Sequence, residues 1–178
     1  SSLCDLRMIW GGDQTIAGIR SNLAQSRCVE LGFADRYSIA VIDADTYLQK
    51  DPTVVARDFY LDTYYSDQNA CSSTRLVLWI GDDIDRAKKI FWNSIQEQAD
   101  QEYSLSDISG SEKLLQTAVL AAACPGIKEI RQNNGLVRIE LPELFEDVMN
   151  YKGNCGYFLE YSLGSLDELA CVLGKQCQ

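Results

Sequence analysis

The chain of 178 residues contains no histidine. A Ser-His or Cys-His catalytic pair is therefore impossible within it. A zinc site is improbable as well, because histidine and closely paired cysteines are the usual zinc ligands. Any general base must be Glu, Asp, Lys or a rarer group, which narrows the chemistry that the chain can perform.

An excess of basic residues is also missing, since the net charge is −10. Nucleic-acid phosphates and anionic membrane surfaces repel such a chain, so neither is expected as a partner. The sequence has no apolar run of about 18 residues, the length that a bilayer-spanning helix needs. Its start shows neither the basic nor the apolar region of a secretion signal.

Paired cysteine motifs are absent too. The cysteines form no CxxC and are odd in number. Most sit in apolar or strand-like surroundings, which is typical of reduced thiols in a cytosolic protein rather than of a disulfide framework. We therefore expect a cytoplasmic protein with seven free cysteines: Cys4, Cys28, Cys71, Cys124, Cys155, Cys171 and Cys177.

The length predicts one domain, or one domain and a fragment. Short apolar runs predict strands at 6–10, 28–31, 37–42, 76–80, 127–131, 136–141 and 157–161. Helical spacing predicts helices at 14–24, 52–65, 84–98, 111–123, 142–149 and 166–174, with a polar connector at 101–110. This alternation indicates an α/β fold with a largely parallel sheet flanked by helices.

Cys71 is the first candidate for chemistry, because it lies in a small polar loop between a predicted helix and a predicted strand. The neighbouring Ala70 and Ser72 leave its sulfur open to a substrate. A thiol reacts as the thiolate, and a nearby cation lowers its pKa. Arg75 is a possible cation. The alternative is that Cys71 is an inert small residue, as most free cysteines are.

Two other strand ends carry candidate groups. Gly11 and Gly12 lie between a strand and a helix, an arrangement that binds anions but is also a common turn. Asp43 and Asp45 end another strand. Two such carboxylates can bind a metal, although they more often serve as turn and cap residues.

Three stretches, in chain order, resemble the aldehyde dehydrogenase superfamily: residues 9–13, 28–33 and 67–73. Four phrases resemble the bacterial long-chain acyl-CoA reductases of the LuxC family within it: Trp10-Gly11-Gly12-Asp13, Phe33-Ala34-Asp35-Arg36-Tyr37-Ser38, Asp58-Phe59-Tyr60 and Asp67-Gln68-Asn69-Ala70-Cys71-Ser72-Ser73. The resemblance covers most of the chain. That family makes the fatty aldehyde for bacterial luciferase.

The resemblance implies roles for five residues. Cys71 would be the nucleophile, and Gly11 and Gly12 would pack against the phosphate or nicotinamide end of the cofactor. Glu30 matches the general base of the superfamily's Glu-Leu-Gly-Gly motif, although Phe33 replaces the second glycine. Asn69 could help to hold the thioester oxygen, or it could stabilise the loop.

The resemblance also implies a reaction and partners. Cys71 would form an acyl thioester that NADPH reduces to fatty aldehyde. The substrate would be a long-chain acyl-CoA or acyl-protein thioester, and the full-length enzyme a homo-oligomer in complex with an acyl-protein synthetase and an acyl transferase. Residues 1–31 would end a Rossmann-type cofactor domain that begins upstream, and 32–178 would form the catalytic domain. The chain alone is expected to be inactive.

Two other functions stay open. In an aldehyde-oxidising NAD(P) dehydrogenase, Glu30 would activate water to hydrolyse the thioester. In a non-catalytic domain, the chain would only dock a partner such as the acyl-protein synthetase.

Overall fold

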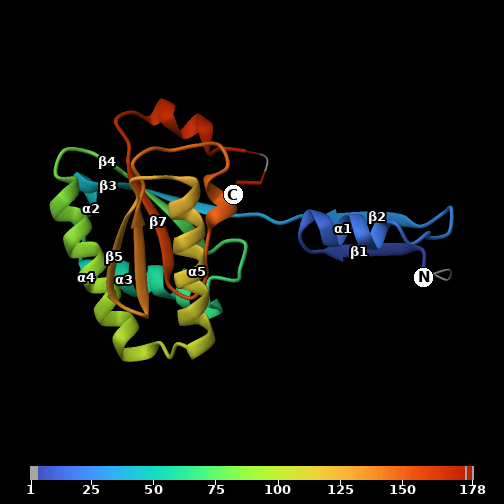
Figure 1. Cartoon of the computed structure of the whole chain (residues 1–178), viewed down its shortest axis with the longest axis horizontal. Helices are drawn as coiled ribbons and strands as arrows, with labels where there is room; N and C mark the ends of the chain where they lie inside the picture. The colour runs from blue at the N-terminus through green and yellow to red at the C-terminus, as the bar shows by residue number, and fades with distance from the viewer. Residues whose placement is uncertain (1–3, 175, 178) are drawn as a thin grey trace. The chain divides into compact units, whose positions relative to one another are not determined.

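The computed structural model describes residues 4–174, 176 and 177. The chain divides into two compact units, Ser1–Arg36 and Tyr37–Gln178 (Figure 1). The division falls after the boundary expected at residue 31, because strand β2 continues to Phe33. No helix of the described residues is long and apolar enough to cross a membrane.

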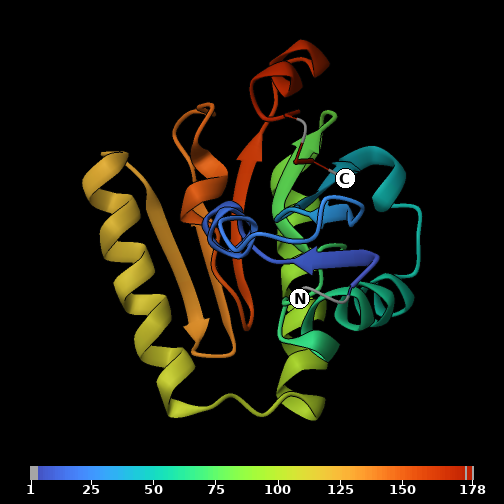
Figure 2. The same cartoon turned by 90° about the vertical axis from the view of Figure 1, so that its right-hand side faces the viewer.

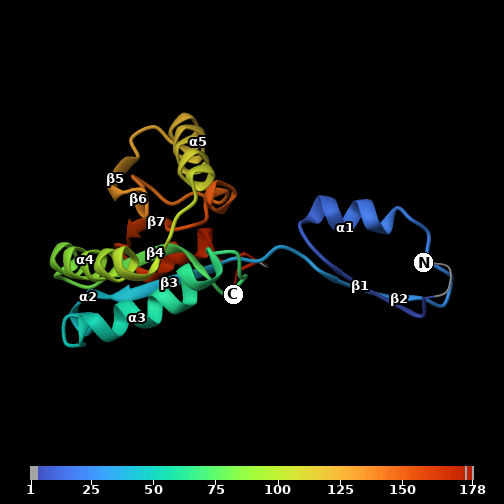
Figure 3. The same ribbon diagram turned by 90° about the horizontal axis from the view of Figure 1, so that it is seen from below.

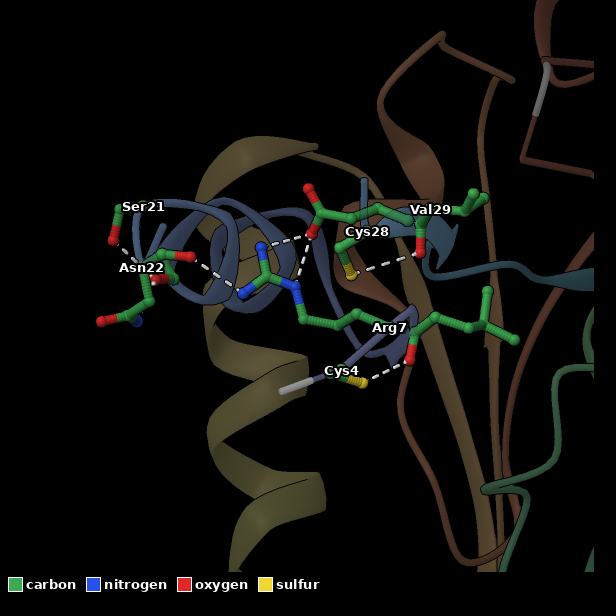
Figure 4. A network of polar contacts seen from close by, with 9 residues as sticks. Cys4, Arg7, Ser21, Asn22, Cys28 and Val29 are labelled. Carbon is green, nitrogen blue, oxygen red and sulfur yellow. Dashed lines mark hydrogen bonds and ion pairs between the residues drawn. The ribbon is translucent and has the colours of Figure 1, made fainter. Parts of the chain in front are cut away.

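The first unit is a β-α-β motif. Its elements are β1 (Leu6–Trp10), α1 (Asp13–Arg20) and β2 (Val29–Phe33), and the two strands pair in parallel. Helix α1 ends earlier than the predicted helix at 14–24. The side chains of Ser21 and Asn22 donate to the carbonyl of Gly18 at 2.7 and 3.3 Å, and such bonds compete with helix continuation (Figure 4).

The second unit is built on a five-stranded sheet, in the order β3-β4-β7-β6-β5. The strands are β3 (Ser38–Asp43), β4 (Thr74–Ile80), β5 (Lys128–Asn133), β6 (Leu136–Glu140) and β7 (Tyr157–Ser162). Every pairing is parallel except β5 with β6. The prediction of an α/β fold with a largely parallel sheet is confirmed.

Helices cover both faces of this sheet (Figures 2 and 3). One face packs against α2 (Ala44–Tyr47), α3 (Pro52–Thr63) and α4 (Ile84–Glu102), with Trp79, Phe91, Trp92 and Phe158 at the centre of that core. The other face packs against α5 (Asp107–Ala123) and the 3₁₀ segments η2 (Val148–Tyr151) and η3 (Leu166–Cys171). Strand β4 lies between the two layers and is buried along nearly its whole length.

Two segments differ from the expectations. The connector at 101–110 is mostly helical, because α4 runs to Glu102 and α5 begins at Asp107 after Ser106, whose Oγ accepts from the Ser109 N–H. The helix expected at 142–149 is wrong, since only the short η2 forms there. Its apolar residues pack on the core through turns instead, so tertiary packing overrides their helical spacing.

In place of the last expected helix, at 166–174, the structure has the 3₁₀ segment η3. It begins with a capping box between Ser165 and Glu168. The paired strands predicted around 127–141 are confirmed as β5 and β6. Their turn is tighter than expected, because β5 extends to Asn133 and leaves only Asn134-Gly135 before β6.

Candidate active site

Cys71 lies at the amino end of β4, in a loop that follows α3 and the 3₁₀ segment η1 (Tyr64–Ser66). Two residues of this loop, Asp67 and Gln68, have φ values of 52° and 56°. Left-handed backbone is uncommon outside glycine and carries strain. The third described non-glycine residue with a positive φ is Cys155, and its N–H donates to the Asp67 carbonyl at 3.1 Å. The strained residues therefore gather at one place.

The side chain of Gln68 holds this place together. It is fully buried, and its Oε1 accepts from the N–H groups of Gly156 and Tyr157 at 2.7 and 3.0 Å. Its Nε2 donates to the carbonyls of Thr74 and Tyr157 at 3.0 and 3.1 Å. One amide thus joins the amino ends of the neighbouring strands β4 and β7, and all four of its hydrogen-bonding positions are used.

Gly156 is required by the same close packing. Its φ is 83°, and a Cβ atom there would lie 2.0 Å from the Gly135 carbonyl oxygen and 2.7 Å from the Tyr64 ring. A side chain at this position would separate the β7 loop from the segment before β6. The glycine therefore keeps the amino ends of β4, β6 and β7 in contact.

Cys71 itself is exposed, whereas its backbone is fixed. Its carbonyl accepts from the buried Ser38 Oγ at 2.9 Å. The following Ser73 is buried, and its Oγ donates to the Asp62 carbonyl at 2.7 Å. Within the part of the chain that the structure describes, the Cys71 N–H donates to no protein acceptor. A solvent-facing thiol therefore sits beside an available N–H donor.

The other described cysteines are less suited to attack. None of Cys4, Cys28, Cys124, Cys155 and Cys177 is fully exposed. Desolvation raises the pKa of Cys28, Cys124 and Cys177, and acidic neighbours add to the effect at Cys28 and Cys124. A raised pKa keeps a thiol protonated and unreactive. The side chain of Cys171 lies outside the described part.

Asn69 lies on the same turn as Cys71 and is exposed. Its Oδ1 accepts from Asn154 Nδ2 at 2.7 Å. The Asn69 N–H donates to the Ser66 carbonyl at 2.8 Å. Both a loop-stabilising role and a role in binding an oxygen are compatible with these contacts, since the amide also carries donor hydrogens.

Arg75, considered as a cation that activates the thiol, has other partners. Its guanidinium is buried and donates to the Gly153 carbonyl at 2.9 Å, to Asn154 Oδ1 at 2.6 Å and to the Gln68 carbonyl. These bonds connect the Cys71 loop to the loop before β7. Arg75 therefore stabilises the architecture of the site.

A cavity of about 290 Å³ adjoins this edge of the sheet. Its walls come from α5, including Lys113 and Leu115, and from the loop at Lys152, Asn154 and Cys155. The cavity has both apolar and charged walls, and its lining residue Asn154 also bonds to Asn69.

Glu30 lies on β2 in the first unit, opposite Arg7 of β1. Arg7 Nε donates to Glu30 Oε2 at 2.6 Å, and Arg7 Nη2 contacts the same oxygen. Arg7 Nη1 donates to the Asn22 carbonyl at 2.9 Å, as Figure 4 shows. The Glu30 side chain is 29% exposed. The carboxylate thus has a structural partner, and its role as a base stays a prediction.

Gly11 and Gly12 connect β1 to α1, as expected. Gly11 has a φ of 151°, and a Cβ at Gly12 would meet nothing within 4 Å, so a ligand can approach the backbone there. The first turn of α1 carries Asp13. Because this carboxylate repels phosphate, the turn suits an uncharged ring better than a phosphate group.

The carboxylates at the end of β3 are structural. Asp43 Oδ1 accepts from the Thr46 N–H at 2.7 Å and caps α2, and hydrogen bonds from the side chain and the N–H of Thr46 lower the pKa of Asp43. Asp45 Oδ2 accepts from the Asp82 N–H at 3.0 Å, after β4. The interpretation of these residues as turn and cap groups is confirmed.

Sequence reasoning missed Gln68, Asn154 and Ser38. Gln68 lies in the stretch 67–73 that resembles the family, but only the pairing of β4 with β7 reveals its four hydrogen-bond partners. Asn154 lies 85 residues from Asn69. No local pattern marks such contacts.

The fold is similar to that of solved aldehyde dehydrogenases. A benzaldehyde dehydrogenase from Corynebacterium glutamicum superposes with a TM-score of 0.62 at 11% identity, over 95% of this chain and 39% of that one. For aldehyde dehydrogenase 21 from Physcomitrella patens the TM-score is 0.62 at 13% identity, over 94% and 37%. At such identities the likeness concerns the fold alone.

Sequence comparison is more specific. Residues 1–100 match the family described as acyl-CoA reductase (LuxC), so the chain belongs to this family. The chain is 33% identical over 97 residues to long-chain acyl-protein thioester reductase 2 of Photobacterium leiognathi. This match covers 54% of the chain and 18% of the relative.

Proposed function

We propose that this chain forms the thiol-bearing part of a reductase that converts a long-chain fatty acyl thioester, carried by coenzyme A or by a protein, into fatty aldehyde. One observation carries the proposal: Cys71 is exposed on a strained loop that buried hydrogen bonds hold in place, and the backbone N–H of Cys71 donates to no acceptor among the described residues. Membership in the LuxC family supports the reaction class. The lack of histidine in the chain is compatible with it, because acyl transfer between thiols needs no imidazole.

The first step is acyl transfer to Cys71. The thiolate attacks the acyl carbonyl carbon, the carbon–sulfur bond to the carrier breaks, and the carrier thiol leaves with a proton. Charge develops on the carbonyl oxygen during this step. The N–H of Cys71 is available to stabilise that charge, and the Nδ2 group of Asn69 is a second candidate.

The second step is reduction of the acyl-cysteine. A reduced nicotinamide, when bound, supplies the hydride. The hydride adds to the acyl carbon, the bond to the Cys71 sulfur breaks, and aldehyde and thiolate are released. Gly11 and Gly12 would lie against the nicotinamide end of the cofactor, as the open backbone at Gly12 and the neighbouring Asp13 favour. We propose NADPH as the reductant.

Glu30 is proposed as the base that takes the proton of the Cys71 thiol. A reductase gains nothing from activating water beside its thioester, so this role fits the reaction better than hydrolysis does. The ion pair with Arg7 gives Glu30 a second task, which is to join β1 to β2.

The proposal extends to the whole protein. The chain spans 18% of the curated relative and 39% of the benzaldehyde dehydrogenase. Residues 1–31 are proposed to form the end of a cofactor-binding domain, with 32–178 as the catalytic domain. The complete enzyme would be a cytoplasmic homo-oligomer that works with an acyl-protein synthetase and an acyl transferase, as in the production of aldehyde for bioluminescence.

The direction of the reaction tests the proposal. The full-length protein that contains this chain is incubated with palmitoyl-CoA and NADPH, or with hexadecanal and NAD⁺. We expect aldehyde and free coenzyme A from the first mixture and much slower turnover in the second. Faster oxidation of aldehyde to free acid would identify a hydrolytic dehydrogenase. Turnover in neither mixture, with synthetase binding kept by Cys71→Ala, would identify a docking domain.

A further inference from the structure

The amide of Asn69 is oriented by two hydrogen bonds that begin at Arg75. Arg75 is 8% exposed, and its Nη1 donates to the side chain of Asn154 at 2.6 Å. A guanidinium has donors and no acceptor. The Asn154 atom that faces Arg75 is therefore the amide oxygen.

The second bond transmits this polarity to Asn69. With its oxygen on Arg75, Asn154 presents Nδ2 to Asn69 at 2.7 Å. The accepting atom of Asn69 must be Oδ1, and its Nδ2 must lie on the other side of the amide. Among the residues described, none accepts from Asn69 Nδ2, and Asn69 is exposed. An NH₂ donor is thus held toward solvent on the turn that carries Cys71.

Both ends of this arrangement are anchored. Arg75 also donates to the Gly153 carbonyl at 2.9 Å and to the Gln68 carbonyl, so it holds the residues directly before Asn154 and before Asn69. The backbone N–H of Asn69 donates to Ser66 at 2.8 Å. A donor that is fixed before reaction stabilises developing charge better than one that must reorient.

The geometry points to Arg75 and Asn154 as positioning residues that orient the Asn69 amide so that Nδ2 donates to the carbonyl oxygen of the thioester on Cys71. This inference rests on the proposed function, in which Cys71 is acylated. Asn69 contacts the reacting oxygen, whereas Arg75 and Asn154 act through it.

The substitution Asn154→Asp reverses the polarity without a change of size. The new carboxylate still accepts from Arg75, but it offers Asn69 an acceptor in place of a donor. Asn69 is then expected to rotate, turning Nδ2 toward residue 154 and its oxygen toward the substrate. Because loss of one such donor costs about 10²–10³-fold in rate, we expect acylation of Cys71 by palmitoyl-CoA to slow by at least about tenfold.

A double-mutant cycle separates orientation from the effect of added charge. In the Asn69→Ala background there is no amide to rotate, so Asn154→Asp should change the acylation rate by less than about threefold. Asn154→Ala, which leaves the Asn69 amide unrestrained, should slow acylation less than Asn154→Asp does, and it replaces that variant if the latter does not fold. Ser72→Ala, an exposed change on the same turn, serves as the matched control.

The carbonyl stretch of the acyl-enzyme gives a readout that a structural role would not move. In protein acylated with ¹³C-carbonyl palmitoyl-CoA, without NADPH, the stretch should shift to higher wavenumber in Asn69→Ala and in Asn154→Asp or its replacement. If the Asn154 variant slows acylation equally with and without Asn69, or leaves both rate and stretch unchanged, the inference is wrong. If the unaltered protein forms no acyl-enzyme, the proposed function itself fails.

Discussion

The five-stranded sheet has a carboxyl edge and an amino edge, where the parallel strands end and begin, and the polar groups at these two edges have different partners. At the carboxyl ends of β3 and β4, Asp43 caps α2 and Asp45 binds the Asp82 N–H, so both carboxylates have backbone partners. At the amino ends of β4 and β7, the backbone is strained at Asp67 and Gln68, and the N–H of Cys71 is available. Ligands of open α/β sheets usually bind at the carboxyl ends of the strands. Here the chemistry is assigned to the opposite edge.

This difference teaches that a strained loop needs a rigid support. Left-handed backbone costs of order 1–3 kcal/mol per residue and persists only where the surroundings over-determine it. Gln68 supplies four hydrogen bonds and Arg75 a further set to the same loop. The support is found at the amino edge, where the candidate nucleophile lies.

Removal of the nucleophile is expected to have the largest effect. Cys71→Ala should lower aldehyde formation from palmitoyl-CoA by more than about 10³-fold, because the acyl-cysteine can no longer form. Steady-state rates of the full-length protein measure it. Cys155→Ser, at the same edge, is the control and should keep most of the activity. Equal losses in both variants would remove the special role of Cys71.

Removal of the Gln68 side chain, which holds the Cys71 loop in place, is expected to have the second largest effect. Gln68→Ala removes four hydrogen bonds to backbone groups of β4, β7 and the loop before β7, and each buried group that stays unsatisfied costs about 1–3 kcal/mol. Urea unfolding should show a loss of about 3 kcal/mol or more, with an acylation rate that also falls. Gln116→Ala, on α5, is the control. Unchanged stability in the Gln68 variant would contradict the description of the amino edge as braced.

Glu30 in the first unit should have an intermediate effect. If it takes the thiol proton, Glu30→Gln should slow acylation by about 10²-fold and leave deacylation without NADPH unchanged. Rapid-quench measurement of the two rates distinguishes these steps. Arg7→Lys, which keeps a cation beside Glu30, is the matched variant. A change of only a few-fold in both rates would leave Glu30 with its structural role in the ion pair alone.

The smallest effect is expected at the carboxyl edge. Hydrogen bonds from the side chain and the N–H of Thr46 lower the pKa of Asp43, so their stabilising contribution is present above the pKa of the unfolded state and is lost as pH falls through the folded-state pKa. Asp43→Ala should therefore lower the melting temperature slightly at pH 7, by a difference that shrinks below about pH 4. Thermal scans across this pH range measure it, and acylation should not change. A large loss of acylation would place chemistry at this edge as well.

Much of the fold follows from local patterns. The strand at Leu6–Trp10, the buried strand before Gly81 and the Asn-Gly turn between β5 and β6 all carry strong local signals, and the structure has them. The helix expected at 142–149 failed because its apolar residues satisfy the core without helical backbone. Ends of helices were displaced where side chains of Ser21, Asn22 or Ser106 bind the backbone.

The site was predictable only in part. Cys71 could be found because small polar residues between a helix and a strand leave a thiol open, and the structure shows it exposed. The partners of Asn69 and Gln68 could not be found, because they come from the loop before β7, which reaches them only through the strand order β4-β7. The assignment of Arg75 to thiol activation followed from sequence spacing alone, and its buried contacts give it a structural role.

The acylated residue is the most direct test of the account. The full-length protein is incubated with palmitoyl-CoA in the absence of NADPH, digested without thiol reagents and analysed by peptide mass spectrometry. The account predicts one stoichiometric palmitoyl adduct, on Cys71, that disappears when NADPH is added. An adduct on Cys28 or Cys155 in its place, or an adduct on Cys71 that NADPH leaves untouched, would contradict it.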